Sequence, residues 1–349
     1  MTFGPQKPLR AWPAFLRRLT RFAALGLFLF ACHCSASPEG EMTSTLFVGN
    51  SRIDVIFESG YTRLSTEEVL RWVQMAAEAV RVYYGRFPVA HVSLHIRETH
   101  GAGVRGGMTF GAADGGRINI RAGSETSAKQ FAHDWMLTHE MIHLAFPQMA
   151  DKHHWIEEGI STYVEPIARI RAGHLTAEQM WADVMRDMPQ GLPEAGDRGL
   201  DHTHTWGRTY WGGAMFCLLA DVGIRRETKN KKGLEDALRG ILDAGGDIRH
   251  GWELAEALRV GDQATGTRVL EKLYEEMKDK PAPVGLNALW KDLGVQQNAG
   301  EVKFDDAAKD AAIRRGITSG VVRKSEGASP EPHRAVFAGR TAGLPWGAR

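Results

Sequence analysis

One group of residues in this sequence could hold a metal ion and activate a water molecule. His139, Glu140 and His143 form the pattern H-E-x-x-H within a stretch of helical periodicity. Residues four apart share one face of a helix, so both imidazoles can reach one ion, with Glu140 beside them. Zn²⁺ binds histidine nitrogens in a tetrahedron and keeps one position for water in catalytic centres, where Glu140 could accept the proton of that water. A surface helix with two unrelated histidines is the alternative.

A tetrahedral site of this kind needs a third protein ligand, and the segment 153–163 offers several candidates. Its W-x-x-E-G pattern resembles the gluzincin metallopeptidases, in whose aminopeptidase branch the Glu before Gly is the third zinc ligand. The resemblance implies that Glu158 is this ligand, after a connecting loop shorter than is common in that branch. Glu157 is the rival ligand. His153 and His154 precede the expected helix, and we interpret them as polar loop residues.

A second segment, from Arg208 to Leu238, resembles the glycyl aminopeptidase family of the peptidase MA-like clan. In that family a tyrosine two residues before a Lys-Gly pair opens a buried helix, and the matching residue here is Tyr210. The pair reads Gly212-Gly213 in this sequence, so the lysine is missing. The resemblance implies that the Tyr210 hydroxyl stabilises the oxyanion of a tetrahedral intermediate. Aromatic packing is the alternative role for this ring.

The sequence departs from these families in the glycine-rich stretch from Gly106 to Phe110. The families place there a strand with a glutamate that holds the amino terminus of the substrate, and the aligned residue is Thr109. The backbone of such a strand can still pair with an extended peptide. The charge that would select a free amino terminus is missing at this position.

Apolar periodicity indicates the elements that position these residues. Strands are expected over Thr45–Glu58 and Val89–Arg97, a hairpin over Val104–Phe110 and Arg117–Arg121, and a capped helix over Thr66–Tyr84. After residue 125 helices dominate, followed by a short strand and a small helix: Ala128–Phe146, Ile156–Ala172, Ala177–Met188, Arg208–Arg226, Leu234–Leu242, Gly251–Arg259, Gly266–Lys278, Glu301–Phe304 and Ala307–Arg315.

This order predicts an α+β fold, in which a small mixed β-sheet with a helix is followed by a mostly helical lobe. The resemblance implies a thermolysin- or gluzincin-like catalytic domain over residues 45–318. Its sheet part would span residues 45–125 and its helical lobe residues 126–318.

The two ends of the chain differ from this domain. Residues 1–36 carry basic residues before a short apolar run, which is typical of an export signal. The run ends Leu-Phe-Ala-Cys at Cys32, which resembles a bacterial lipoprotein box and implies membrane attachment through a lipid on that cysteine. Ordinary cleavage after Ala36 is the alternative. We therefore expect a periplasmic or membrane-anchored protein, with a flexible tail over residues 323–349.

Charge and cysteine content exclude several other classes of protein. The 349 residues include 43 Lys+Arg and 42 Asp+Glu, so the chain has no marked excess of positive charge for binding nucleic acid. Three cysteines cannot form a four-thiolate zinc site, and Cys217 lies in an apolar run typical of a buried, inert thiol. We interpret His202 and His204 as loop residues, and Thr162, one turn after Glu158, as a partner of that ligand.

These observations together predict a zinc-dependent peptidase that acts on peptides or proteins. His139, His143 and Glu158 would bind Zn²⁺, while Glu140 and Tyr210 would be catalytic. Two alternatives stay open, namely an exported zinc-containing module without activity and a metallohydrolase of non-peptide amides or esters. The sequence leaves the oligomeric state, the substrate and the choice between amino-terminal and internal cleavage open.

Overall fold

The computed structural model describes residues 42–58, 60, 63–298 and 301–319. All of them belong to one unit, Gly40–Arg349. The expected export signal with Cys32 and the expected tail lie outside the described residues. No helix among the described residues has the length and apolarity to cross a membrane.

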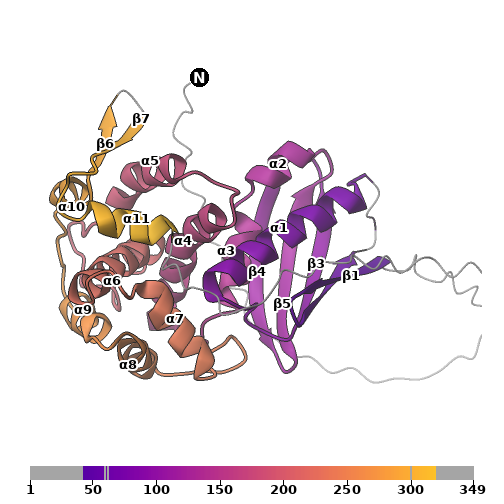
Figure 1. Cartoon of the computed structure of the whole chain (residues 1–349). Helices are drawn as coiled ribbons and strands as arrows, with labels where there is room; N and C mark the ends of the chain where they lie inside the picture. The colour runs from indigo at the N-terminus through magenta and orange to yellow at the C-terminus, as the bar shows by residue number, and fades with distance from the viewer. Residues whose placement is uncertain (1–41, 59, 61–62, 299–300, 320–349) are drawn as a thin grey trace, which may run out of the picture. The chain divides into compact units, whose positions relative to one another are not determined.

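A mixed sheet of five strands forms the first part of this unit (Figure 1). Its strand order is β1-β2-β3-β5-β4, with antiparallel pairs at both edges and parallel pairs between β2, β3 and β5. The prediction of one strand over Thr45–Glu58 is wrong, because the chain reverses at Gly49, whose φ of +60° suits glycine, and forms two strands. The strands are β1 (Met42–Val48), β2 (Ser51–Phe57), β3 (His91–Thr99), β4 (Val104–Ala112) and β5 (Gly115–Gly123).

Alternation along these strands builds the core between the sheet and the helices. Val92, Leu94 and Ile96 of β3 are fully buried, as the period of two predicts, and Ile118 and Ile120 of β5 continue the same layer. Helix α1 (Thr66–Tyr84) has the Ser65 cap expected from the sequence and buries its apolar face in this core. The edge strand β4 is left more exposed than β3 and β5.

The helix predicted over Ala128–Phe146 is two helices, α2 (Ala128–His133) and α3 (Met136–His143). Asp134 separates them, because its extended backbone, with ψ of 137°, cannot continue a helix. Its carboxylate accepts hydrogen bonds from the amides of Met136 and Leu137, at 3.2 and 3.1 Å, and so caps α3. Helix α3 is therefore a separate helix from α2, and the H-E-x-x-H residues lie in its last turns.

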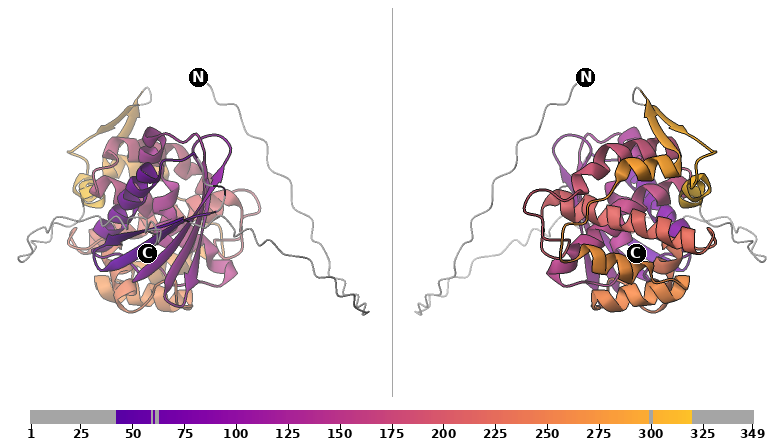
Figure 2. Two further views of the ribbon diagram at one scale, coloured as in Figure 1. Left: turned by 90° about the vertical axis from the view of Figure 1, so that its right-hand side faces the viewer. Right: turned by 90° about the vertical axis from the view of Figure 1, so that its left-hand side faces the viewer.

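Helices make up most of the rest of the unit, which confirms the α+β class and the helical lobe (Figures 1 and 2). Sequence patterns misplaced α8 (Leu254–Thr265) and α11 (Ala311–Ser319) by several residues. They missed two short elements, α10 (Leu286–Leu293) and β6 (Val295–Asn298). The elements of this lobe are α4 (His154–Arg171), α5 (Ala177–Asp187), α6 (Gly213–Glu227), α7 (Leu234–Asp243), α8 (Leu254–Thr265), α9 (Val269–Met277), α10 (Leu286–Leu293), β6 (Val295–Asn298), β7 (Glu301–Phe304) and α11 (Ala311–Ser319).

The helix predicted over Arg208–Arg226 contains a change of helix type. Arg208–Gly212 is a π-helical turn, and the α-helical part, α6, begins at Gly213. A π-helical turn places one extra residue in the helix and is frequent at functional sites. Tyr210 lies in the middle of this turn.

Helices α4 and α6 approach each other closely at two glycines. A Cβ added to Gly213 would lie 2.7 Å from the Cα of Gly159 and would also collide with the carbonyl oxygen of Trp155. Gly159 is the glycine of the W-x-x-E-G pattern, and Gly213 is the second glycine of the pair after Tyr210. Both glycines are needed for this spacing between the helix that carries Glu158 and the helix that follows Tyr210.

We expect Gly213→Ala to lower the free energy of unfolding by about 1–3 kcal/mol, because the added methyl group must push the two helices apart. Urea denaturation of both proteins measures this difference. Gly251→Ala is the matched control, since a Cβ there would meet only the carbonyl oxygen of Gln148, at 3.9 Å. Equal losses in the two variants would contradict the close helix contact.

Candidate metal centre

Two helices bring three potential metal ligands together. Helix α3 carries His139 and His143, whose ring centroids lie 5.0 Å apart, and α4 carries Glu158. One Glu158 carboxylate oxygen lies 3.1 Å from Nε2 of His139 and 3.8 Å from Nε2 of His143. One ligand atom from each of the three residues falls within 4.8 Å of the others. The interhelical geometry therefore selects Glu158, rather than Glu157, to complete the group.

The protonation states of these groups suit metal binding. Burial lowers the pKa of His143 to about 3, and the neighbouring His139 acts in the same direction, so the His143 imidazole is neutral at physiological pH. Burial acts to raise the pKa of Glu158, but hydrogen bonds from His139 and His154 outweigh it and keep the carboxylate ionised. Metal ligands must be deprotonated, and both groups meet this requirement.

The rival ligands occupy other contacts. The Glu157 carboxylate accepts a hydrogen bond from the amide of Met149, at 3.2 Å, and contacts the ring of His154. His153 is buried and pairs with Asp201 at 3.1 Å. The expectation that His154 lies in a loop is wrong, because it is the first residue of α4. There it lies 3.3 Å from the second carboxylate oxygen of Glu158 and so contacts the ligand group from outside.

The side chain of Glu140, a residue of α3, contacts the edge strand β4. The Thr109 hydroxyl is 2.6 Å from Oε2 of Glu140 and 2.9 Å from the Glu140 carbonyl oxygen. Gly107 leaves room for this carboxylate, since a Cβ there would lie 2.5 Å from the Glu140 Cγ. Burial raises the pKa of Glu140, while the hydrogen bond from Thr109 acts in the opposite direction. A buried carboxylate with a raised pKa, held in one orientation, is suited to accept a proton and release it again.

Tyr210 belongs to a row of four rings beside the ligand group. Its ring stacks on His139, with centroids 6.3 Å apart, and on Trp206, with centroids 5.5 Å apart. Trp135 contacts His139 edge-on, with centroids 5.5 Å apart. Burial, with the nearby Glu158 and Glu140 carboxylates, raises the pKa of Tyr210 to about 12. The hydroxyl therefore remains a hydrogen-bond donor at physiological pH, in reach of the ligand group.

These side chains line one cavity of about 810 Å³. Its walls are strand β4, with residues 106–111, and the faces of α3 and α4 that carry His139, Glu140, His143 and Glu158; Tyr210 closes one side. Of the other residues considered from the sequence, Thr162 lines a neighbouring cavity, and His202 pairs with Asp279 at 2.9 Å. His204 is exposed and does not line either cavity. Thr162 shares a face of α4 with Glu158, four residues earlier, but its side chain lines another cavity.

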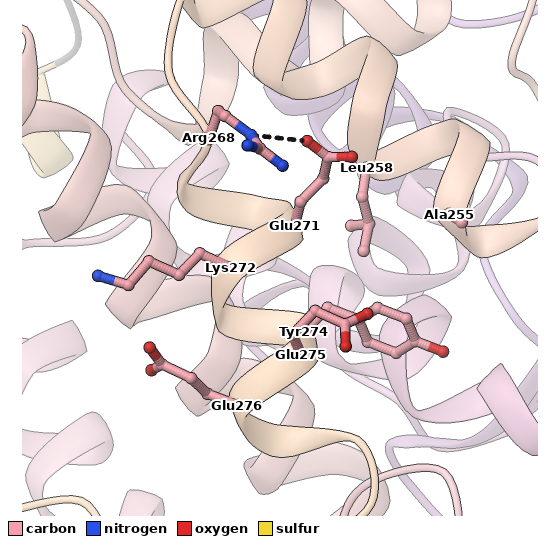
Figure 3. A pocket seen from close by; sticks show the side chains of 8 residues that line it. All are labelled: Ala255, Leu258, Arg268, Glu271, Lys272, Tyr274, Glu275 and Glu276. Atoms are coloured by element: carbon pink, nitrogen blue, oxygen red, sulfur yellow. Dashed lines mark hydrogen bonds and ion pairs between the residues drawn. The ribbon is translucent and has the colours of Figure 1, made fainter.

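A cavity of similar size on α8 and α9 lacks this chemistry (Figure 3). It measures about 690 Å³ and is lined mostly by charged side chains of α9, among them the half-buried Glu271, which pairs with Arg268 at 3.4 Å. Its lining contains no histidine or cysteine and holds no group of three ligands that meets the criterion satisfied by His139, His143 and Glu158. The arrangement of ligands, and not the size of the cavity, thus distinguishes the candidate centre.

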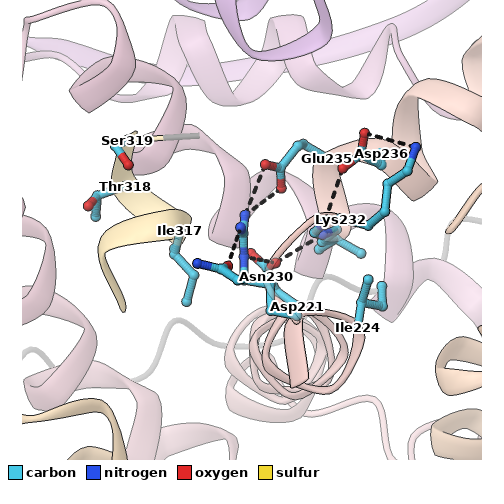
Figure 4. A network of polar contacts seen from close by, with 12 residues as sticks. Asp221, Ile224, Asn230, Lys232, Glu235, Asp236, Ile317, Thr318 and Ser319 are labelled. Carbon is cyan, nitrogen blue, oxygen red and sulfur yellow. Dashed lines mark hydrogen bonds and ion pairs between the residues drawn. The ribbon is translucent and has the colours of Figure 1, made fainter. Parts of the chain in front are cut away.

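A cluster of buried charges around Arg225 is structural. The Arg225 guanidinium donates to Asp221 at 2.7 Å and to both carboxylate oxygens of Glu235, at 2.9 and 2.8 Å. Figure 4 shows Asp221 and Glu235 converging at this point, with Asn230 beside them. Tyr163 of α4 donates to Asp221 at 3.0 Å. Each ionised group has a partner of opposite charge, so the cluster connects α4, α6 and α7.

Two imidazole nitrogens and one carboxylate, all buried or nearly so, match the donor set of catalytic zinc sites, which take three protein ligands. The site therefore fits Zn²⁺ by ligand type and proximity. Sequence reasoning found these three residues together with Glu140 and Tyr210. It did not find the Thr109–Glu140 hydrogen bond, the space provided by Gly107, or the two tryptophans of the ring row, none of which has a sequence signature of its own.

A solved structure of a known protein agrees with this fold, whereas two comparisons by sequence find no match. No family model matches the sequence, and the search of curated proteins finds no match. A solved structure of an aminopeptidase N family protein from Idiomarina loihiensis matches at 13% identity, with a TM-score of 0.55, over 73% of this chain and 49% of that one. An M1 zinc metallopeptidase from Deinococcus radiodurans matches at 15% identity, with a TM-score of 0.45, over 70% and 54%. The first match shows a shared gluzincin-like fold, and this chain spans about half the length of that structure.

Proposed function

We propose that this protein is a zinc-dependent peptidase that hydrolyses peptide bonds. The observation that carries the proposal is the position of the Glu140 carboxylate, which lines the same cavity as the His139, His143 and Glu158 ligand group. A structural zinc site needs neither a carboxylate outside its ligand group nor a phenol beside it. Glu140 and Tyr210 therefore favour an enzyme over a binding module without activity. A bound zinc ion would supply Lewis acidity, which acidifies water and polarises a carbonyl group.

The residues of the chain have distinct roles in this proposal. Glu140 accepts the proton of the attacking water and then delivers it to the leaving amine. Thr109 holds the Glu140 carboxylate in place through its 2.6 Å hydrogen bond. Tyr210 donates a hydrogen bond from its hydroxyl to the oxyanion that develops on the substrate and keeps its proton.

The edge strand favours a peptide over another amide or ester. Strand β4 pairs with β5 on one side and lines the cavity with residues 106–111. Its unpaired backbone groups can bind an extended peptide by strand addition, which requires a substrate with a regular backbone. A small non-peptide amide or ester would gain nothing from this strand.

The polar groups of the cavity do not favour a free amino terminus. The Thr109 hydroxyl, at the position where the resembling families place a glutamate, is engaged by Glu140. Glu157 is engaged by the amide of Met149 and by His154, and Glu158 by His139 and His154. An ammonium group bound in this cavity would therefore compete with existing contacts of each carboxylate.

Cleavage of matched peptides tests both parts of the proposal. We expect hydrolysis by the zinc-loaded protein, its loss with a chelator and its return when Zn²⁺ is added back. We also expect acetylation of the peptide amino terminus to change kcat/KM by less than about tenfold, or about 1.4 kcal/mol. Mass spectrometry of the products gives the position of cleavage.

The two parts can fail separately. Chelator-resistant cleavage, or no cleavage of any peptide by zinc-loaded protein, would contradict the peptidase proposal. Strict dependence on a free amine would instead keep the peptidase and show that one of the engaged carboxylates is released to bind it.

The proposal includes export of the chain, with a lipid on Cys32 or cleavage after Ala36, and this rests on the sequence of the leader.

A further inference from the structure

A second cavity adjoins the candidate centre and has no role in the steps above. It measures about 700 Å³, within the range of about 300–1,000 Å³ typical of ligand sites. Its walls come from α4, α5 and the segment from Trp206 to Trp211. Thr162, Glu165 and Arg169 continue along α4 the same helix face that presents Glu158 to the ligand group. A group bound in this cavity would therefore lie beside His139, one of the three candidate ligands.

The row of rings forms the boundary between the two cavities. Trp135, His139 and Tyr210 line both of them, and Trp206 lines the second cavity. The two tryptophans stand at the ends of the row and are unusually exposed for this residue, at 49% for Trp135 and 60% for Trp206. Exposed tryptophans at the mouth of a cavity are typical of binding sites, because they gain most when another apolar group covers them.

The charged side chains of the second cavity are paired with one another. Glu165 and Arg169 form an ion pair of 2.9 Å in its buried part. Arg186 pairs with both Asp183 and Asp187, at 2.6 Å each. The Arg186 pairs are largely exposed, but a charged group that entered the buried part of the cavity would lose its hydration and find Glu165 and Arg169 already engaged. A neutral group would lose little and would gain contact with the aromatic rings.

We propose that this cavity is a specificity pocket that binds a large neutral side chain of the peptide substrate, aromatic by preference, close to the cleaved bond. The inference rests on the proposed peptidase function, because it assigns a substrate class to the same site. Trp206 and Trp135 are the residues that determine this preference. They act on the substrate side chain and take no part in the transfer of protons.

A peptide series in which one position at a time carries Trp, Phe, Ala, Asp or Lys tests this assignment. We expect kcat/KM to be highest for an aromatic residue at one position next to the cleaved bond. Trp206→Ala and Trp135→Ala should each lower the ratio of kcat/KM for the aromatic peptide to that for the alanine peptide by about tenfold. The ratio separates specificity from any general loss of activity, since Trp206 also packs on Tyr210.

The matched control is Phe47→Ala, which removes a ring of similar exposure, 55%, from β1 at the far edge of the sheet. This variant should leave the ratio unchanged. A wild-type preference for Lys or Asp at every position, or an unchanged ratio in both tryptophan variants, would overturn the specificity pocket.

Direct binding keeps this test independent of catalysis. The probe is N-acetyl-L-phenylalaninamide, and the readout is the shift of the indole N–H signals of Trp135 and Trp206 in NMR spectra, assigned with Trp→Phe variants. Saturable shifts of these two signals are expected even if no peptide is cleaved, and would then support the pocket while the peptidase proposal fails. No shift at millimolar probe, in a protein that cleaves peptides, would overturn the pocket alone.

Discussion

Replacing Glu140 with glutamine is expected to lower kcat by about 10²–10⁴-fold while the protein keeps its zinc. The amide has the size of the carboxylate and can still accept the hydrogen bond from Thr109, but it cannot accept a proton from water. Glu140 is not among the three ligand residues, so the zinc content of the variant should equal that of the wild type. Single-turnover rates on a peptide that the wild type cleaves, together with metal analysis of the same samples, measure both quantities.

Glu157→Gln separates Glu140 from the other acid of the cavity that is not among the three ligand residues. Glu157 is held by the amide of Met149 and by His154, away from the ligand group. Its amide should therefore retain most of the wild-type rate. A loss confined to Glu157→Gln, with Glu140→Gln active, would show that the base has been assigned to the wrong residue.

Tyr210→Phe is expected to lower kcat by about 10²–10³-fold, with little change in KM or in zinc content. The variant keeps the ring that stacks on His139 and Trp206 and removes only the hydroxyl. Its effect should appear in the transition state, where the oxyanion develops, and not in the binding of the ground state. Steady-state kinetics on one peptide give the two constants.

The pH dependence checks the same role. The raised pKa of Tyr210, about 12, keeps the phenol protonated at lower pH, so titration of this group should not reduce the rate of the wild type up to about pH 10. Wild-type turnover in Tyr210→Phe would show that the ring serves packing alone. Thr209→Ser, at the neighbouring position, is a control for general disturbance of the π-helical turn, because Thr209 lines neither cavity.

Sequence patterns predicted the parts of this molecule in which local signals and tertiary packing agree. The buried alternation of Val92, Leu94 and Ile96 predicted a strand, and the Ser65 cap predicted the start of α1. The spacing of His139 and His143 placed both rings on one helix face, and the structure brings Glu158 to them. Their roles in metal binding and catalysis remain predictions that the experiments above address.

Tertiary contacts decided the features that the sequence did not reveal. Asp134 reads as an ordinary residue of a long helix until its carboxylate is seen to cap α3 and to accept a hydrogen bond from Trp72, 62 residues away. Thr109 differs from the glutamate of the resembling families, and only the approach of β4 to α3 shows that it binds Glu140. The exposure of Trp206 is equally invisible, because aromatic residues in a sequence more often indicate core.

The π-helical turn from Arg208 to Gly212 fixes the phase between two surfaces with different requirements. Helix α6 must present Gly213 to Gly159, while Tyr210, only three residues earlier, must face His139. Each residue advances an α-helix by about 100°, so deleting one residue from this turn would rotate Tyr210 by about that angle relative to α6. The extra residue of this turn thus lets Tyr210 face His139 while Gly213 keeps its contact with Gly159, so the two requirements are met within one helix.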